Sequence, residues 1–143
     1  MIFGLKAGSK KQILQELARV AAEQVGLHDR VVFDVLLERE RLGSTGVGEG
    51  VAIPHGRIAD LKGLSGVFAL LKQPVDFDAL DGKPVDLVFL LLAPQSAGAD
   101  HLKALSRISR LLRDRNVRDK LRGARSDDAL YALLTSGTAS EAA

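Results

Sequence analysis

Two long apolar runs, residues 64–71 and 85–93, place the strongest constraint on how this chain can fold. A strand with one face in water alternates apolar and polar residues, whereas a strand covered on both faces is apolar almost throughout. Both runs follow the second pattern, so helices must cover both faces of the sheet that contains them. Neither run is long enough to cross a bilayer, which takes about 20 apolar residues.

Helical patterns surround these two strands. We predict a fifth helix that starts at the cap Ser126, and four earlier ones at residues 9–25, 29–42, 98–113 and 115–121. Ser9 followed by Gln12 matches a capping box, and Gly26 is a typical helix end. Asp29 is predicted to cap the second helix, because an aspartate side chain can accept hydrogen bonds from the free N–H groups there.

Shorter strands are predicted at residues 2–5, at residues 51–53, and at residues 75–77 after a turn over residues 72–74. Helices that alternate with buried strands are typical of the α/β class, and 143 residues suit one domain. We therefore predict a single α/β domain with a central sheet flanked by α-helices on both faces. It is expected to span residues 1–137, followed by a disordered tail at residues 138–143.

Composition and charge exclude several functional classes. The chain has no cysteine, which excludes thiol catalysis, disulfides and cysteine-ligated metals. Its 20 basic and 18 acidic residues give a net charge of +2, too balanced for a protein whose main partner is a nucleic acid. The basic residues between 107 and 125 are interrupted by Asp114 and Asp119, so we interpret them as a solvated helix surface. No signal-peptide pattern is present, and a cytoplasmic protein without membrane insertion is expected.

A glycine-rich stretch at residues 44–57 carries the main candidate for chemistry, His55. Pro54 fixes one backbone angle and removes an N–H, and Gly56 follows His55 at once. We expect His55 to leave a strand end in a loop whose backbone N–H groups can bind an anion. Neutral imidazole is a good nucleophile near pH 7. This chemistry supports a reactive histidine without naming the reaction, and a loop histidine with no role is the alternative.

His101 is the second candidate. The spacing of His101, Leu105, Ile108 and Leu112 places this histidine in the first turn of a helix and turned toward the protein. It is either a hydrogen-bonded core histidine or a neighbour of a bound phosphate at the helix start. No Walker-type loop is present, so direct use of ATP is not expected. The aspartates between residues 76 and 86 lack a recognisable ligand spacing, so neither a metal site nor a cofactor is predicted.

The stretch STGVGEGVAIPHGR at residues 44–57 resembles the active-site segment of a known family. It is similar to the enzyme IIA domains of the bacterial phosphoenolpyruvate-dependent sugar phosphotransferase system, in the fructose/mannitol class. Within that class the nitrogen-regulatory enzyme IIA is the most similar. Residues 75–94 and 101–108 resemble the same family in the same order, and the resemblance extends over about residues 9–134.

This resemblance implies roles for named residues and a mixed sheet. His55 is implied to be phosphorylated on Nε2, with His101 as a second active-site histidine that stabilises the transferring group. Arg39 and Glu49 match polar active-site positions, and Gly56 and Arg57 adjoin the phosphorylated residue. The implied phosphoryl donor is an HPr-like phosphocarrier, and the implied partners are regulated proteins or an enzyme IIB.

Three functions stay open from the sequence. The first is a nitrogen-type regulator that carries a phosphoryl group on His55 and acts through phosphorylation-dependent protein contacts. The second is a sugar-transport enzyme IIA that passes the group to an enzyme IIB. The third is a metal hydrolase using His55, His101 and an aspartate, which the missing ligand motif disfavours.

Overall fold

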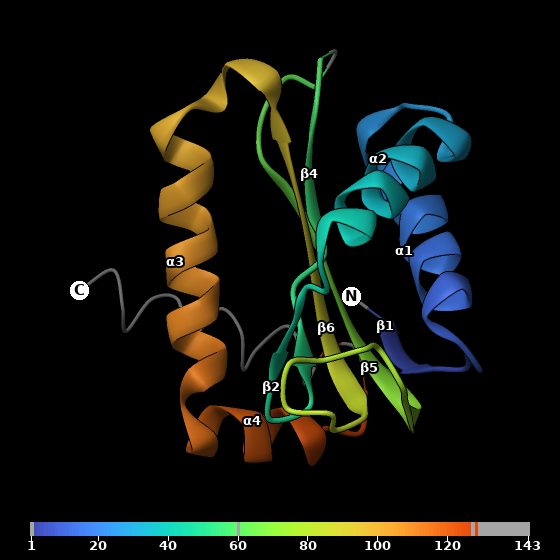
Figure 1. Ribbon diagram of the computed structural model, residues 1–143, viewed down its shortest axis with the longest axis vertical. Helices are drawn as coiled ribbons and strands as arrows, with labels where there is room; N and C mark the ends of the chain where they lie inside the picture. The colour runs from blue at the N-terminus through green and yellow to red at the C-terminus, as the bar shows by residue number, and fades with distance from the viewer. Residues whose placement is uncertain (1, 60, 127, 129–143) are drawn as a thin grey trace.

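The computed structural model describes residues 2–59, 61–126 and 128, and shows a six-stranded mixed sheet between helices (Figure 1). Helices α1 (Lys10–Val25) and α2 (Asp29–Leu42) lie on one side of the sheet. Helix α3 (Ala99–Arg113) lies on the other side. The prediction of a single α/β domain with helices on both faces is confirmed.

The two apolar runs form the centre of the sheet as the antiparallel pair β5 (Ser65–Val75) and β6 (Val85–Pro94). Neighbouring residues on a strand point to opposite faces. Val67 accordingly packs in the core beneath α1 and α2, while Phe68 packs in the core beneath α3. Both side chains are 1% exposed, which confirms that this strand is covered on both faces.

Strand β5 is longer than predicted, because residues 72–74 continue it to Val75 instead of forming a turn. Leu70 lies opposite Leu87 and Val75 opposite Val85, so five steps along β5 match two steps along β6. The extra residues are absorbed in an irregularity of the ladder, the kind of place where a strand tolerates proline. The predicted separate strand at residues 75–77 is therefore absent from this part of the described chain.

The remaining strands extend the sheet in the order β1-β5-β6-β3-β2, with β4 also paired to β6. Their bounds are Ile2–Leu5 for β1, Gly46–Gly48 for β2, Val51–Ala52 for β3 and His55–Ile58 for β4. Strands β3 and β4 run along the same edge of β6 in one register, with Val51 opposite Leu87 and His55 opposite Leu91. His55 therefore begins a strand, and its predicted position in a loop is wrong.

Pro54 interrupts the pairing of this segment with β6 and so separates β3 from β4. It has no N–H to donate, but its carbonyl accepts a hydrogen bond from the Leu91 N–H at 3.0 Å. The register is unchanged on either side of it. The ladder resumes at His55, which is thereby held against the central strand β6 rather than at the tip of a mobile segment.

Helix α1 starts and ends as predicted. Ser9 is its N-cap and accepts a hydrogen bond from the Gln12 N–H at 3.2 Å, while Gly26 ends it with φ +71°. The Gln12 side chain accepts from the Gly8 N–H at 2.7 Å, one residue earlier than in a standard capping box. The buried face of this helix consists of Ile13, Leu14, Leu17, Ala18, Ala21 and Ala22.

Helix α2 is capped by His28, and the prediction of Asp29 as the cap is wrong. The His28 Nδ1 accepts a hydrogen bond from the Arg30 N–H at 3.2 Å. Asp29 is instead the first helical residue, where a negative charge still favours the positive end of the helix.

The C-terminal part begins with the short helix η1 (Gln95–Ala97), followed by α3 and α4 (Arg115–Arg122). The buried Arg118 donates to the carbonyls of Leu112 at 3.1 Å and Arg113 at 2.6 Å. These carbonyls have no helical partner at the end of α3, so Arg118 satisfies them. Beyond Ser126, the predicted last helix and the tail lie outside the described residues, apart from Asp128. None of the helices in the described chain is long and apolar enough to cross a membrane.

Candidate active site

His55 is held by a hydrogen bond to a carbonyl just before its strand. Its Nδ1 lies 2.8 Å from the carbonyl oxygen of Ile53, with Pro54 between them. Because a carbonyl can only accept, we assign the ring proton to Nδ1. The other ring nitrogen, Nε2, then carries a free electron pair and is the nucleophilic atom.

Arg39 approaches that second nitrogen from α2. Its Nε donates to His55 Nε2 at 3.3 Å, and its Nη1 donates to the Gly43 carbonyl at 2.9 Å. A guanidinium has no acceptor, so this contact agrees with an unprotonated Nε2. Burial lowers the pKa of His55, and the charge of Arg39 lowers it further against the opposing effects of the Ile53 carbonyl and Glu40. His55 is therefore neutral at pH 7, the form that can attack phosphorus.

His101 lies next to His55, because the first turn of α3 brings its ring beside that of His55. The two ring centroids are 5.7 Å apart and the rings are edge-on, with 70° between their planes. His101 is only 5% exposed, which confirms the inward position predicted from helical spacing. The pKa of His101 is lowered by burial, and by the neighbouring His55 and Arg57.

Arg57 contacts the second histidine rather than the first. Its Nε donates to His101 Nδ1 at 3.0 Å, and its Nη2 lies 3.5 Å from the Gly98 carbonyl just before α3. The other nitrogen of His101, Nε2, is buried and has no hydrogen-bond partner among the described residues. The site thus has two histidines, each with one nitrogen facing an arginine.

Gly56 allows the strand and the helix that form the site to approach each other. A Cβ atom added at Gly56 would overlap with Cγ1 of Val35 on α2. Only glycine therefore lets β4 lie this close to α2 without a shift of one of them. That approach brings Arg39 within reach of His55.

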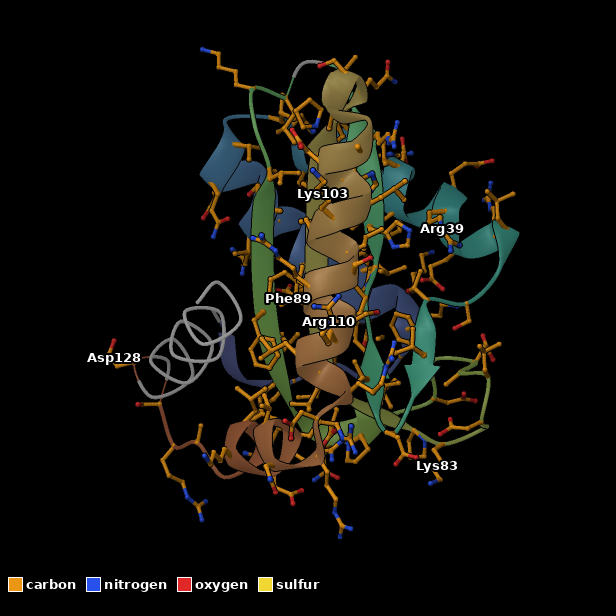
Figure 2. The ribbon with its side chains drawn as sticks, turned by 90° about the vertical axis from the view of Figure 1, so that its left-hand side faces the viewer. Arg39, Lys83, Phe89, Lys103, Arg110 and Asp128 are labelled. Carbon is orange, nitrogen blue, oxygen red and sulfur yellow. The ribbon has the colours of Figure 1, made fainter. Side chains whose placement is uncertain are left out.

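Glu49 is the one predicted site residue that the structure does not bring to the two histidines. It sits in the turn between β2 and β3 with φ +56°, and its carboxylate lies 3.9 Å from Lys83 Nζ. Val51 and His55 lie opposite residues four apart on β6, a separation of about 13 Å. Glu49 precedes Val51, on the side away from His55; Figure 2 shows its partner Lys83 near one end of the sheet and Arg39 closer to the middle.

The backbone of Glu49 is anchored at this distant end. Its N–H donates to Asp81 at 3.0 Å, and its carbonyl accepts from Arg122 at 2.7 Å. Arg122 also forms an ion pair with Asp86 at 3.0 Å. In this arrangement Glu49 helps to hold the glycine-rich stretch, and a role for it beside His55 stays a prediction.

Glu40 supports the site and was missed from the sequence. Its carboxylate is buried, accepts from the Thr45 N–H at 3.1 Å and from the Thr45 hydroxyl, and pairs with Lys10 Nζ at 2.7 Å. These bonds tie the end of α2 to the glycine-rich stretch and to the start of α1. The available signal was its spacing: Glu40 continues the buried stripe of Val32 and Leu36, where a charge needs a partner.

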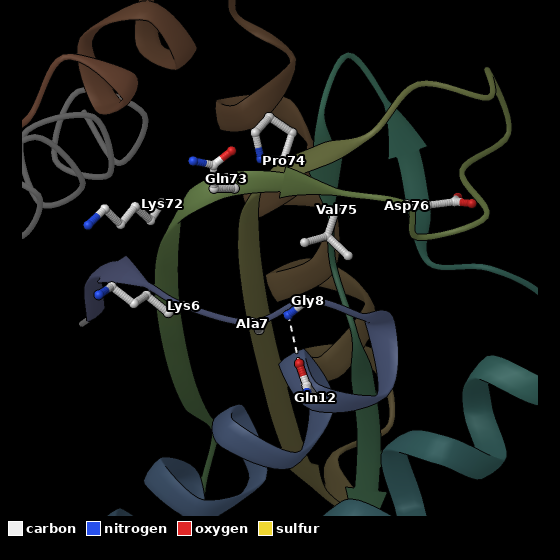
Figure 3. Close-up of a pocket in the computed structure, with 9 residues that line it drawn as sticks. All are labelled: Lys6, Ala7, Gly8, Gln12, Lys72, Gln73, Pro74, Val75 and Asp76. Carbon is white, nitrogen blue, oxygen red and sulfur yellow. Dashed lines mark hydrogen bonds between the residues drawn. The ribbon is translucent and has the colours of Figure 1, made fainter.

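A second concave region lies away from the histidines (Figure 3). This open depression of about 660 Å³ is lined by residues around the β1–β5 edge and the start of α1, including Lys6, Gly8, Gln12, Lys72 and Pro74. No histidine lines it, and the Gly8 N–H is already bonded to Gln12. We therefore place the candidate chemistry at His55. Among the described residues, no group of three or more His, Asp or Glu side chains is arranged to hold a metal ion.

Comparison with known proteins shows which family this chain belongs to. Residues 1–137 match the family described as the phosphoenolpyruvate-dependent sugar phosphotransferase system, EIIA 2. The chain belongs to this family. As an EIIA 2 member it is a component of a phosphotransferase system, and the resemblance seen in its three sequence motifs is confirmed.

Individual relatives show which members of the EIIA 2 family this chain is most similar to. It is 61% identical over 130 residues to a nitrogen regulatory protein of Bradyrhizobium diazoefficiens, covering 91% of this chain and 85% of that one. The crystal structure of nitrogen regulatory protein IIA-Ntr from Neisseria meningitidis matches with a TM-score of 0.89 and 41% identity, covering 93% and 91% of the two chains. IIA mannitol from Escherichia coli matches with a TM-score of 0.78 and 26% identity, covering 93% and 94%. The chain is thus most like the nitrogen-regulatory members.

Proposed function

We propose that this protein is a phosphohistidine carrier that accepts a phosphoryl group on His55 Nε2 from an HPr-like phosphocarrier. The observation that carries the proposal is the 2.8 Å contact between His55 Nδ1 and the Ile53 carbonyl. It assigns the proton to Nδ1 and leaves the Nε2 electron pair for phosphorus. The lowered pKa of His55 supports the same neutral form.

In the proposed step the Nε2 electron pair of His55 forms a new bond to phosphorus. The P–N bond to the donor's histidine breaks, and the donor's imidazole leaves with the electron pair of that broken bond. His55 keeps its proton on Nδ1, so no proton needs to move within this site. Catalysis of such a transfer consists mainly of positioning and charge stabilisation.

Arg39 and His101 supply that stabilisation in the proposal. In the free protein Arg39 donates to the electron pair of His55 Nε2. The attack uses that electron pair, so Arg39 then donates to the phosphoryl oxygens instead. The buried Nε2–H of His101 donates to another phosphoryl oxygen. Both groups come from helices, α2 and α3, so the backbone already places them beside His55.

The proposed biological role is regulatory, exerted through phosphorylation-dependent contacts with partner proteins. The similarity to proteins named as nitrogen regulatory supports this role. A second candidate is a sugar-transport enzyme IIA that passes the phosphoryl group to an enzyme IIB. The structural similarity to IIA mannitol supports this second candidate function.

The test is incubation with enzyme I, an HPr-like carrier and phosphoenolpyruvate, followed by intact mass and ³¹P NMR. We expect one acid-labile phosphoryl group on Nε2 of wild type, and none on His55→Ala. His28→Ala is the matched control, because His28 is exposed and its contacts are the cap of α2 and the neighbouring Asp29. Labelling that persists in His55→Ala would refute the assignment.

The two roles are separated by adding partners to the phosphorylated protein. Loss of the label to a purified enzyme IIB would support the transport role. Retention of the label in its presence, together with partner proteins that bind only one of the two phosphorylation states, would support the regulatory role.

A further inference from the structure

We infer that Arg57 is a positioning residue for phosphoryl transfer: it fixes the tautomer of His101 so that Nε2 carries the proton. The inference rests on the proposed function and adds a residue that acts through His101 rather than on the phosphoryl group. The relevant contact is the 3.0 Å hydrogen bond from Arg57 Nε to His101 Nδ1.

The direction of this hydrogen bond determines the state of the ring. A guanidinium has only donors, so His101 Nδ1 must accept and cannot carry a proton. A neutral imidazole with an unprotonated Nδ1 carries its proton on Nε2. The lowered pKa of His101 supports the neutral ring.

The remaining nitrogen is set up for a ligand. His101 Nε2 is buried and lacks a partner among the described residues, a costly arrangement for an N–H group. The ring lies edge-on to His55 at 5.7 Å, so the unpaired donor belongs to the ring that adjoins the nucleophile, where the phosphoryl group would be bound. The opposite tautomer would present an electron pair to the phosphoryl oxygens and would repel them.

Strand β4 explains how one segment prepares both histidines. His55 and Arg57 are two residues apart on β4, so their side chains leave the same face of the strand. The strand therefore carries the nucleophile and the residue that orients the nucleophile's neighbour. The Gly98 carbonyl, 3.5 Å from Arg57 Nη2, keeps the guanidinium beside the start of α3.

The first measurement is two-bond ¹H–¹⁵N NMR of the histidine rings in the full chain, which distinguishes protonated from unprotonated nitrogens. In wild type we expect His101 to be protonated on Nε2 and not on Nδ1. In Arg57→Met we expect a tautomer mixture and a raised pKa of His101. Arg57→Lys, which retains a donor, should restore part of the wild-type pattern. Lys103→Met, which removes an exposed charge on α3, should leave the pattern unchanged.

The second measurement is the rate of phosphoryl transfer from the HPr-like carrier. We expect Arg57→Met to slow it by about ten- to a hundredfold, by analogy with the loss when the partner that orients a metal-binding histidine is removed. A wild-type tautomer pattern in Arg57→Met would overturn the inference, and so would a changed pattern with an unchanged rate. A wild type that is never labelled would refute the proposed function instead, and the NMR would still decide whether Arg57 sets the tautomer.

Discussion

Arg39 Nε donates a hydrogen bond to His55 Nε2 at 3.3 Å, so the guanidinium covers the electron pair that the proposed reaction requires. The same arginine is anchored to the Gly43 carbonyl at 2.9 Å. In the free protein this contact holds the imidazole in place. During transfer the arginine must pass from the ring nitrogen to the phosphoryl oxygens.

Replacing Arg39 tests this double role. We expect Arg39→Met to slow phosphorylation of His55 by about a hundredfold or more, the usual loss when a donor to the transition state is removed. The pKa of His55 should rise, because the charge of Arg39 lowers it. Rapid-quench labelling and ring NMR measure the two effects. Arg41→Met is the control, because Arg41 is exposed on the same helix and pairs only with Glu38 among the described residues; an equal loss there would contradict the prediction.

Replacing His101 tests the unpaired donor. We expect His101→Ala to slow transfer by about a hundredfold, because a phosphoryl oxygen loses its buried N–H partner. His101→Gln, whose amide can donate, should recover part of that rate. Transfer kinetics with a saturating HPr-like donor measure the effect. A wild-type rate in the alanine variant would show that His101 is only a core residue.

The two histidines also predict how stability depends on pH. Their pKa values are lowered in the folded protein, so between those values and the unfolded value near 6.5 the unfolded chain binds more protons. The free energy of unfolding should therefore fall as the pH drops below about 6.5. Urea titrations from about pH 7.5 to about pH 5 measure this slope. In His55→Ala/His101→Ala the slope should be shallower, and an unchanged slope would contradict the prediction.

We expect replacement of the buried Glu40 to lower the free energy of unfolding more than replacement of an exposed acidic residue. Glu40→Ala would leave the Thr45 N–H without its buried acceptor and remove the ion pair to the partly exposed Lys10, at a cost of about 1–3 kcal/mol in the free energy of unfolding. Glu38→Ala, on the exposed side of the same helix, should stay within about 0.5 kcal/mol of wild type. Urea unfolding of both variants measures the difference, and equal values would show that the contacts of the buried Glu40 carboxylate are unimportant for stability.

Gly56 offers a test of the approach between β4 and α2. Gly56→Ala should destabilise the fold by about 1–3 kcal/mol, because the new methyl group overlaps with Val35. Adding Val35→Ala should restore part of the loss by making room. Gly63→Ala is the control, because a Cβ there meets nothing within 4 Å. Thermal unfolding measures all three, and a loss as large at Gly63 would refute the steric explanation.

Much of the fold was predictable because its causes are local. The cap at Ser9, the end at Gly26 and the apolar run that became β6 each depend on residues within a few positions of one another. The inward position of His101 follows from helical periodicity in the same way. Local patterns failed at Pro74, which normally indicates a turn, because the ladder to β6 absorbs the irregularity.

The sequence by itself determined the α/β class, both ends of helix α1 and His55 as the candidate nucleophile. Only the tertiary structure decided that His55 begins a strand, that Arg57 faces His101 rather than the nucleophile, and that Glu49 is anchored toward Lys83 and Arg122. The reason is that strand register and the approach of α2 and α3 set distances between residues as far apart as Arg57 and His101. No pattern within a short window of sequence contains those distances, because they arise from packing the whole domain around one core.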